Sequence, residues 1–382
     1  MQVDISPPEQ WDTTDQTYTS SHEYVVFASD LHMSDWSRGD DFMMGHNEGP
    51  VAPVNDKTAL FACALMFAMR QAQQSGAPGV ELVLNGDTID LWEMIGRGTG
   101  FAHPGFLGLL NAFRQIPGNN IVAITGNHDW ILPALPIWNV AAAYWNPVLE
   151  TYATHGHQWD NLNNNPANPV CIGRNIAQIQ GQIEPNPGSR FFNRPFPFCL
   201  IDNIKPLSYK QLSAFINNRL SGWGKLLKFF AVPRLIRRIA NQLGPLVIED
   251  NDDYLIKAAN DIAAGRIIAP GLPAGAGPAK RIVFGHTHMP AFQIPYFNTA
   301  SWTPMLAFTF IKRGRWPFRR QIATETLMDL NPQLHIYKNI NIGRIVERMY
   351  YYNTAVPFGP GINPQQQTRL TVQALRRALG YR

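Results

Sequence analysis

The sequence predicts a layered α/β protein, and two observations support this fold class. First, several short apolar runs end at glycine, aspartate, asparagine or histidine, as buried strands do where they leave a sheet for a tight turn. Second, segments with apolar residues at helical spacing lie between these runs, at residues 56–74 and near 106–115. A chain that alternates strands with helices is expected to form sheets covered by helices.

The remaining segments are assigned from their composition. Residues 1–21 are expected to form a loose leader, because they are polar and lack the basic start and apolar centre of a secretory signal. The uncharged run at 130–149 is interrupted by prolines, which favours a buried helix and loop over a membrane span. Apolar runs at 305–340 predict closing strands, and 341–382 predicts a tail with a short basic helix.

The composition is that of a globular chain. Hydrophobic residues make up 45% of the 382 residues and charged residues 16%, which excludes a disordered protein and allows a large core. Three cysteines (Cys63, Cys171 and Cys199) form no C-x-x-C pair, so a disulfide framework is not expected. This cysteine usage favours a reducing compartment, and we expect a cytoplasmic protein.

Five apolar runs end in turns that carry metal-ligand residue types. In the central one, residues 82–84 lead into Asn85-Gly86-Asp87, and Asp90 follows three residues later. The other four turns are Ser29-Asp30-Leu31-His32, Gly126-Asn127-His128-Asp129, His155-Gly156-His157 and Gly285-His286-Thr287-His288. A carboxylate has two oxygens, so the central aspartate can bind two metal ions at once. Carboxylate, amide and imidazole ligands suit Mn, Fe or Zn.

The five turns in this order resemble those of the calcineurin-like metallophosphoesterases. That family carries D-x-H, G-D-x-x-D, G-N-H-[DE], H-G and G-H-x-H, and each element is present here. The resemblance covers residues 22–160 and 280–312, about half of the chain. It implies a layered β-sandwich flanked by helices, and hydrolysis of a phosphodiester, pyrophosphate or phosphomonoester bond. The nucleophile would be a hydroxide that bridges two divalent metal ions, with Mn favoured over Fe or Zn.

The resemblance also implies a role for each residue of the motifs. The ligands of one ion would be Asp30, His32, Asp87 and His288. The ligands of the other ion would be Asp87, Asn127, His155 and His286. His128 would lie near the leaving oxygen as proton donor or charge stabiliser, and Asp90 would hold it as a cation. Asp129 is expected to bond the loop backbone. For His157 and Asp160, a role beside the ligands and a plain loop role both stay open.

Residues 161–275 separate the fourth turn from the fifth and predict an inserted, mostly helical cap. The core would then comprise residues 22–160 and 276–340. No acidic residue occurs between residues 203 and 248, where lysine and arginine alternate with tryptophan, phenylalanine and leucine. Three interpretations stay open: an amphipathic pair of helices on anionic lipid, a cap whose cations meet an anionic substrate, or ordinary solvated helix faces.

Departures from the family pattern narrow the substrate class. Leu91 and Asp129 stand where the serine/threonine protein phosphatases carry Arg and Glu, which disfavours a phosphoprotein substrate. The placement of the cap is similar to that in the UDP-2,3-diacylglucosamine hydrolases, although these commonly carry Arg where this chain has His128. We therefore expect a phosphate-containing small-molecule or lipid-linked substrate, with peripheral membrane contact through the basic cap.

Two alternatives come from other functional classes. A nuclease of the same fold would need a basic groove for a phosphate backbone, and the net charge of +4 makes nucleic acid the less expected partner. A metal-free scaffold on a phosphoesterase fold would have no reason to keep seven metal ligands. Metal analysis separates the enzymes from the scaffold.

Overall fold

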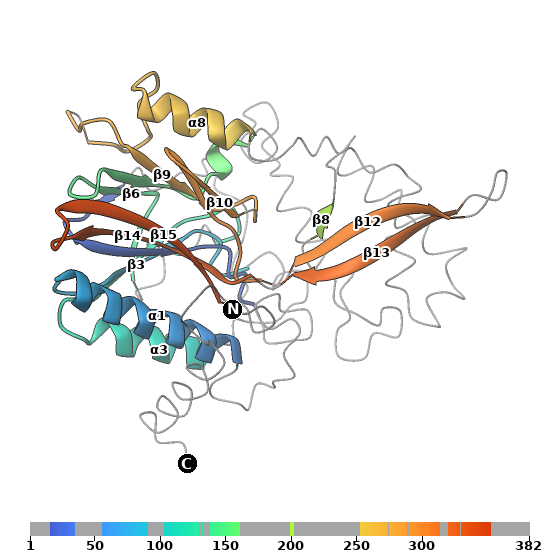
Figure 1. Cartoon of the computed structure of the whole chain (residues 1–382), viewed down its shortest axis with the longest axis horizontal. Coiled ribbons are helices and arrows are strands. Elements are labelled where there is room, and N and C mark those ends of the chain that lie inside the picture. Colours follow the sequence, from blue (N-terminus) through green and yellow to red (C-terminus); the bar gives the residue numbers. More distant parts are fainter. Residues whose placement is uncertain are drawn as a thin grey trace, which may run out of the picture.

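The computed structural model describes residues 16–34, 56–90, 103–129, 132, 138–160, 199–201, 253–273, 275–288, 290–303, 305–313, 320–328 and 330–352. Within these residues the chain forms an α/β structure with two mixed six-stranded sheets (Figure 1). The predicted α/β class is therefore confirmed. The predicted basic segment at 203–248 and the helix near the C-terminus lie outside the described residues.

The first sheet has the strand order β15-β14-β2-β3-β4-β5. Its members are β2 (Tyr24–Ala28), β3 (Glu81–Asn85), β4 (Asn120–Ile124), β5 (Asn139–Ala141), β14 (Pro332–Asn339) and β15 (Arg344–Tyr351). Strands β2 to β5 are parallel, and β14 runs antiparallel to both β2 and β15. Strands β2 and β3 are buried along their whole length, which explains why they appear in the sequence as continuous apolar runs.

The second sheet has the order β1-β6-β7-β9-β11-β10. Its members are β1 (Thr17–Thr19), β6 (Ala143–Asn146), β7 (Thr151–Ala153), β9 (Arg281–Phe284), β10 (Pro290–Gln293) and β11 (Tyr296–Thr299). Strands β7, β9 and β11 are parallel to one another. Both sheets thus contain a block of parallel strands whose carboxyl ends can carry polar turns.

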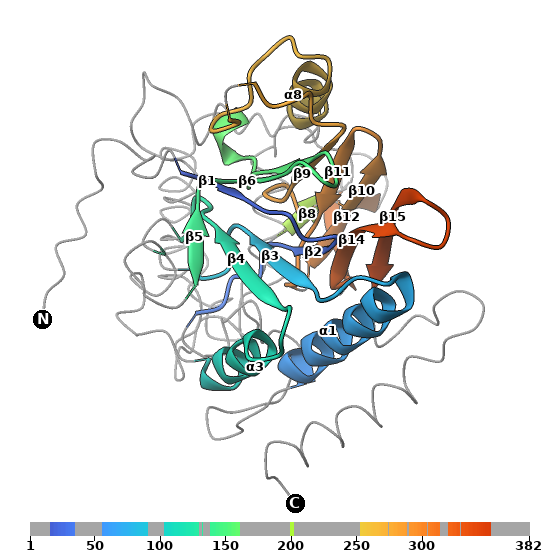
Figure 2. The same ribbon diagram turned by 90° about the vertical axis from the view of Figure 1, so that its left-hand side faces the viewer.

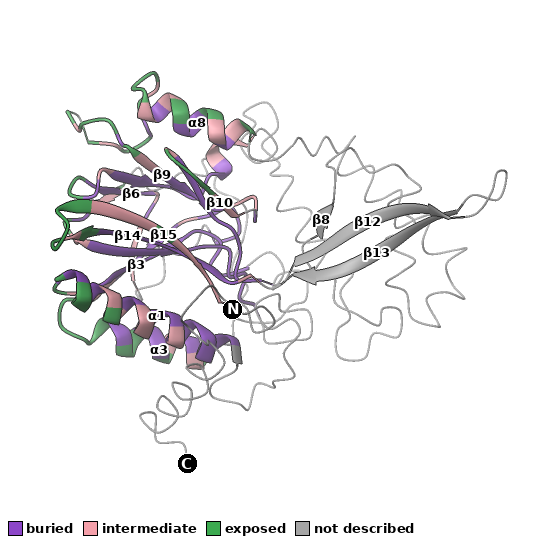
Figure 3. Ribbon diagram, in the orientation of Figure 1, coloured by how far each residue is buried: buried purple, intermediate pink, exposed green. Residues whose placement is uncertain are grey.

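The two sheets pack face to face with helices on their outer faces (Figure 2). Side chains alternate along β2: Val25 and Phe27 face the second sheet, whereas Val26 and Ala28 face the helices. Helices α1 (Asp56–Ser75) and α3 (Pro104–Arg114) cover the first sheet, and α8 (Asp253–Ala263) covers the second. The inner strands are buried throughout, and exposed residues gather on the outer helices and strand ends (Figure 3).

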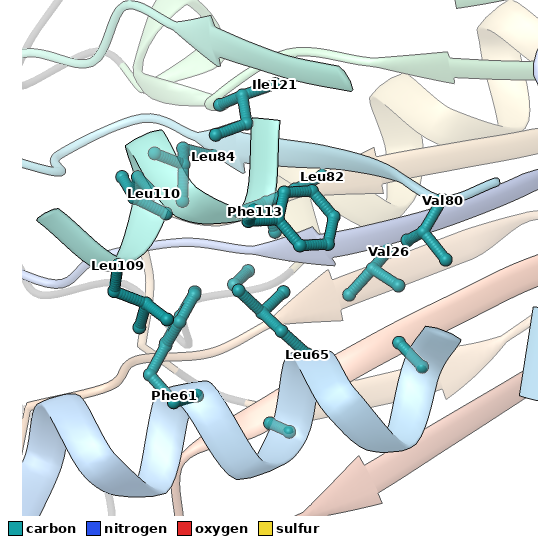
Figure 4. Packing of buried hydrophobic residues seen from close by; sticks show 14 of the residues in the cluster. Val26, Phe61, Leu65, Val80, Leu82, Leu84, Leu109, Leu110, Phe113 and Ile121 are labelled. Atoms are coloured by element: carbon teal, nitrogen blue, oxygen red, sulfur yellow. The ribbon is translucent and has the colours of Figure 1, made fainter. Parts of the chain in front are cut away.

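Helix α1 matches the prediction for residues 56–74. Its apolar side chains, among them Phe61 and Leu65, pack with residues of α3 and of the sheet (Figure 4). The helix ends where Gly76 adopts a φ of 84°, and the Ala77 N–H donates to the Ala72 carbonyl at 2.9 Å. A left-handed glycine with this bond is a common way to satisfy the last carbonyls of a helix.

The prediction of a buried helix and loop at 130–149 is wrong for the part that the structure describes. Residues 139–141 and 143–146 are strands β5 and β6, paired with β4 and β7. The sequence of β6 contains Tyr144 and Trp145, which favour strands, and both are buried between layers. No helix among the described residues is both long enough and apolar enough to cross a membrane.

The predicted closing strands divide between two places. Strand β14 joins the first sheet beside β2, as a closing strand would, and β15 completes a hairpin with it. Strands β12 (Met305–Arg313) and β13 (Arg320–Met328) instead form a separate sheet with β8 (Cys199–Ile201). The β12–β13 hairpin projects away from the two six-stranded sheets (Figure 1).

Three elements of the two six-stranded sheets and their covering helices fall in segments that the sequence assigns to the leader, the insertion and the tail. Strand β1 pairs in parallel with β6, and β15 pairs with β14. Helix α8 packs on the second sheet through Leu255, Ala259 and Ile262. The layers therefore include residues from before residue 22 and after residue 340, and from the end of the range predicted to be an insertion.

Candidate metal centre

The five predicted turns lie at one end of the paired sheets, because each follows the carboxyl end of a parallel strand. Strands β2, β3 and β4 deliver three of them from the first sheet, and β7 and β9 deliver two from the second. The first two turns remain hydrogen-bonded to each other beyond their strands. The Asp30 N–H donates to the Gly86 carbonyl at 3.0 Å, and the His32 N–H to the Asp87 carbonyl at 2.9 Å.

Asp30, His32 and His288 form a buried cluster that could hold a metal ion. Asp30 Oδ1 lies 3.2 Å from His288 Nε2 and 3.8 Å from His32 Nε2. The two Nε2 atoms are themselves 3.2 Å apart. Two imidazole nitrogens and a carboxylate oxygen thus converge on one small volume, as the ligands of a single cation do.

Asp87, His155 and His286 form a second such cluster. Asp87 Oδ2 lies 3.0 Å from His155 Nε2 and also 3.9 Å from His32 Nε2, which belongs to the first cluster. The Asp87 carboxylate therefore lies between the two groups. His286 comes from the turn after β9, and its Nε2 lies 3.0 Å from Asp160 Oδ2.

The third turn brings His128 and Asn127 to the same end of the sheets. The His128 N–H donates to Asp87 Oδ1 at 2.8 Å, which places the adjacent, buried Asn127 beside the second cluster. The His128 ring lies next to the first cluster, with its centroid 4.7 Å from that of the His32 ring. Its Nδ1 lies 3.0 Å from Asp90 Oδ2, the same oxygen that lies 3.2 Å from His32 Nδ1. Asp90 thus links His128 to the first cluster.

Strained backbone is concentrated at these residues. Five of the seven predicted ligands are non-glycine residues in the left-handed region: Asp30 (φ 53°), His32 (46°), Asp87 (48°), His286 (71°) and His288 (59°). This region is costly for side chains with a Cβ, by about 1–3 kcal/mol per residue. Such conformations persist only where the surrounding structure imposes them, and they are characteristic of ligand and catalytic sites.

Three glycines leave room for a ligand from a neighbouring turn. A Cβ on Gly86 would lie 2.2 Å from His155 Nδ1, and one on Gly126 would lie 2.1 Å from Asp87 Oδ1. A Cβ on Gly285 would lie 2.5 Å from Asp30 Oδ2. Each glycine therefore permits contact between two motifs that are distant in the sequence.

The charges of the site reinforce one another. Burial would raise the pKa of Asp87, but the adjacent His155 and His128 hold the pKa of this carboxyl well below its usual range. The pKa of Asp90 is likewise lowered, against burial, by His128. Burial opposes protonation of His155, yet the Asp87 and Asp30 carboxylates raise the pKa of His155 to about 9. The protein thus keeps its carboxylates ionised in a buried position, ready to bind cations.

Asp129 has the loop role that the sequence predicts. Its two oxygens accept hydrogen bonds from the Thr88 N–H at 2.7 Å and the Gly126 N–H at 2.6 Å. Burial and the nearby charge of Asp87 raise the pKa of the Asp129 carboxyl to about 7. This residue fastens the second and third turns to each other.

The structure adds supporting residues that the sequence does not identify. Asn298, at the end of β11, donates to the Gly285 carbonyl at 2.8 Å, and Ser301 Oγ donates to the Asp30 carbonyl at 2.8 Å. Ser29 Oγ donates to the Ala300 carbonyl at 2.9 Å. The turn after β11 therefore holds the first and fifth motifs in place. Its Asn-Thr-Ala-Ser-Trp sequence at 298–302, behind an apolar strand, was the available signal.

The residues at this end of the sheets fit a divalent cation. Facing imidazole nitrogens and ionised carboxylates are the ligand types of Mn, Fe and Zn sites, and the buried clusters are already assembled. No protein-family model and no curated protein matches the chain.

Proposed function

We propose that this protein is a dinuclear metal-dependent phosphoesterase. The observation that carries the proposal is the position of Asp87, whose carboxylate lies between two buried acid–histidine clusters. Asp30, His32, Asp87 and His288 would hold one ion, and Asp87, Asn127, His155 and His286 the other. The order of the five sequence motifs, which resembles that of the calcineurin-like metallophosphoesterases, supports the same proposal.

A bound pair of divalent ions, manganese being favoured, would supply a nucleophile from water and neutralise charge on the phosphoryl oxygens. The chain's own residues would bind and orient the phosphate and manage the proton of the leaving group. His128 is suited to that last task. Burial opposes its protonation, but the charges of Asp90 and Asp87 raise the pKa of His128, so its imidazolium form persists to higher pH than that of a free histidine.

Asp90 would keep His128 in the required state. Its Oδ2 lies 3.0 Å from His128 Nδ1, so Nε2 would be the nitrogen that acts on the leaving oxygen. A carboxylate in this position both orients the imidazole ring and stabilises its positive charge. The same oxygen lies near His32, so the Asp90 carboxylate would couple the proton donor His128 to the first metal cluster.

We propose a pyrophosphate or phosphodiester substrate with a bulky organic group. This part rests on the sequence of the inserted segment, where basic residues alternate with large apolar ones between residues 203 and 248. Such a composition suits an amphiphile or a nucleotide–lipid conjugate, and it would also allow contact with an anionic membrane surface.

A substrate panel tests the function directly. The manganese-loaded protein would be assayed with phosphomonoesters, phosphodiesters, nucleotide diphosphate conjugates, and single- and double-stranded DNA. We expect metal-dependent release of product from a small phosphodiester or pyrophosphate. Faster cleavage of DNA with a steep salt dependence would support a nuclease instead, and no turnover in a protein that binds no metal would support a scaffold.

A further inference from the structure

The turn that follows β7 contributes a second polar residue to the site besides His155. After Gly156 (φ 111°) the chain forms a 3₁₀ turn, η3 (His157–Trp159), and then returns Asp160 toward the turn after β9. The Trp159 N–H donates to the Gly156 carbonyl at 3.0 Å, and the Asp160 N–H to the His157 carbonyl at 3.1 Å. These bonds fix the direction in which Asp160 leaves the turn.

Asp160 contacts His286, which belongs to the turn after β9, in a mostly buried position. The Asp160 Oδ2 and His286 Nε2 atoms are 3.0 Å apart, and the two side chains are 16% and 9% exposed. Since an ionised carboxylate can only accept, the Nε2–H of His286 is the donor. The Nδ1 atom of the same ring is then the nitrogen without a proton in the neutral imidazole.

Two other histidines of the site have the opposite arrangement. His155 donates its Nδ1–H to the Asn85 carbonyl at 3.0 Å and faces Asp87 with Nε2. His32 has Nδ1 beside Asp90 and faces His288 with Nε2. In each case a fixed partner occupies one ring nitrogen and the other nitrogen faces the cluster. For His286, the partner on Nε2 is Asp160.

We propose that Asp160 is a positioning residue that makes Nδ1 of His286 the metal-binding atom. The inference rests on the metal-binding part of the proposed function. A carboxylate that holds the distal N–H of a ligating histidine fixes its tautomer and ring orientation and makes the ring a stronger ligand. Loss of such a partner typically lowers metal affinity by about 10–100-fold.

The first test is the proton position in the metal-free wild-type protein. Long-range ¹⁵N–¹H NMR of histidine-labelled protein reports which ring nitrogen carries the proton. We expect the proton of His286 on Nε2, with the His286 signals assigned from their loss in His286→Gln. A proton on Nδ1 of His286 would overturn the inference, and this result depends on neither a variant at 160 nor on turnover.

The second test is calorimetric titration of the metal-free protein with Mn²⁺. Asp160→Ala should weaken one of two binding events by about 10–100-fold, whereas Asp160→Asn, whose amide oxygen still accepts a hydrogen bond, should lose less. Asp261→Ala is the matched control, because it removes a carboxylate of the outer helix α8 that pairs with Arg266. Unchanged affinity in a folded Asp160→Ala protein, or equal weakening of both events, would contradict the proposed role.

The two tests separate this inference from the proposed function. A wild-type protein that binds two ions but hydrolyses no phosphate ester would refute the phosphoesterase proposal and leave the role of Asp160 intact. An active wild-type enzyme whose metal binding is indifferent to Asp160 would refute only the inference.

Discussion

Strand β3 carries a buried carboxylate at each end, and the two differ in almost every respect. Glu81 begins the strand and Asp87 follows its end; both are at most 2% exposed. Glu81 accepts hydrogen bonds from three neutral donors, namely Tyr144 at 2.6 Å, Asn120 at 2.8 Å and the Ser20 hydroxyl, and the partly exposed His22 lies 3.3 Å from its Oε1. Its hydrogen-bonding capacity is therefore satisfied by the fold itself, as a structural buried charge requires.

Asp87 lies among several ionisable residues. His155 lies at 3.0 Å and His32 at 3.9 Å, the carboxylates of Asp30 and Asp90 also lie near His32, and the backbone at Asp87 is left-handed. Such an arrangement is a poor way to stabilise a fold, because like charges repel and the backbone is strained. A carboxylate on strained backbone among several charged groups is thus suited to binding, whereas one held mainly by neutral donors is suited to stability.

Asp87→Asn should have the largest effect on activity. The amide keeps the size of the side chain but offers one metal-binding oxygen and no charge, so at least one ion should be lost. We expect turnover to fall by about 10³-fold or more, with little change in melting temperature. Circular dichroism and elemental analysis of the purified variant provide the check. Retention of two ions with near-wild-type turnover would mean that the site is assigned incorrectly.

His128→Ala should lower turnover by about 10²–10⁴-fold, the usual contribution of a general acid, with metal content unchanged. The loss should be smaller for nitrophenyl esters, whose leaving group needs no proton. Steady-state kinetics with good and poor leaving groups distinguishes the roles. An equal loss for both would indicate that His128 binds substrate rather than donating a proton.

Glu81→Gln is the reciprocal change at the other end of β3. It leaves donors such as the Tyr144 hydroxyl with a poorer acceptor, so the free energy of unfolding should fall by about 1–3 kcal/mol. Metal content and turnover should stay at the wild-type level. Urea unfolding measures the first and elemental analysis the second. Loss of metal with intact stability would erase the contrast between the two carboxylates.

His335→Gln should have the smallest effect on activity, and its main signature should be the pH dependence of stability in acid. Burial between α1 and the first sheet lowers the pKa of His335 to about 3, although Tyr24 contacts its Nδ1 at 2.8 Å. Because the unfolded chain binds a proton near pH 6.5 and the folded protein does not, wild-type stability is complete above that pH. It should then fall toward pH 3 by up to about 1.4 kcal/mol per pH unit.

The variant lacks this titration, so its unfolding free energy should depend less steeply on pH over the same range. Parallel slopes for the wild type and His335→Gln in urea unfolding between pH 6.5 and pH 4 would show that the buried histidine does not contribute.

The sequence predicts which residues converge but not how they face one another. Each ligand type directly follows an apolar strand, and parallel strands bring their carboxyl ends together, so the grouping of Asp30, Asp87 and His155 follows from local pattern. The choice of ring nitrogen depends on partners distant in the chain, such as Asp160 for His286. The placement of β12, predicted as a closing strand, escapes the sequence for the same reason. One of its two partners, β8, lies about a hundred residues earlier in the chain.

The sequence also fails to distinguish a strand from a helix where apolar residues do not recur at a regular spacing. The uncharged run at 130–149 has no clear helical or alternating spacing, and its strands β5 and β6 exist because β4 and β7 offer free edges. By contrast, helix α1 has a long apolar face and a terminating glycine, so both its presence and its end are visible in the sequence.

Crystals of the manganese-loaded wild-type protein offer the most direct test of the central claim, which is that Asp87 lies between two metal ions. Anomalous scattering at the manganese edge locates the ions independently of any assay. We expect two peaks about 3.5–4 Å apart, one on each side of the Asp87 carboxylate. A single peak, no peak, or peaks remote from Asp87 would contradict it.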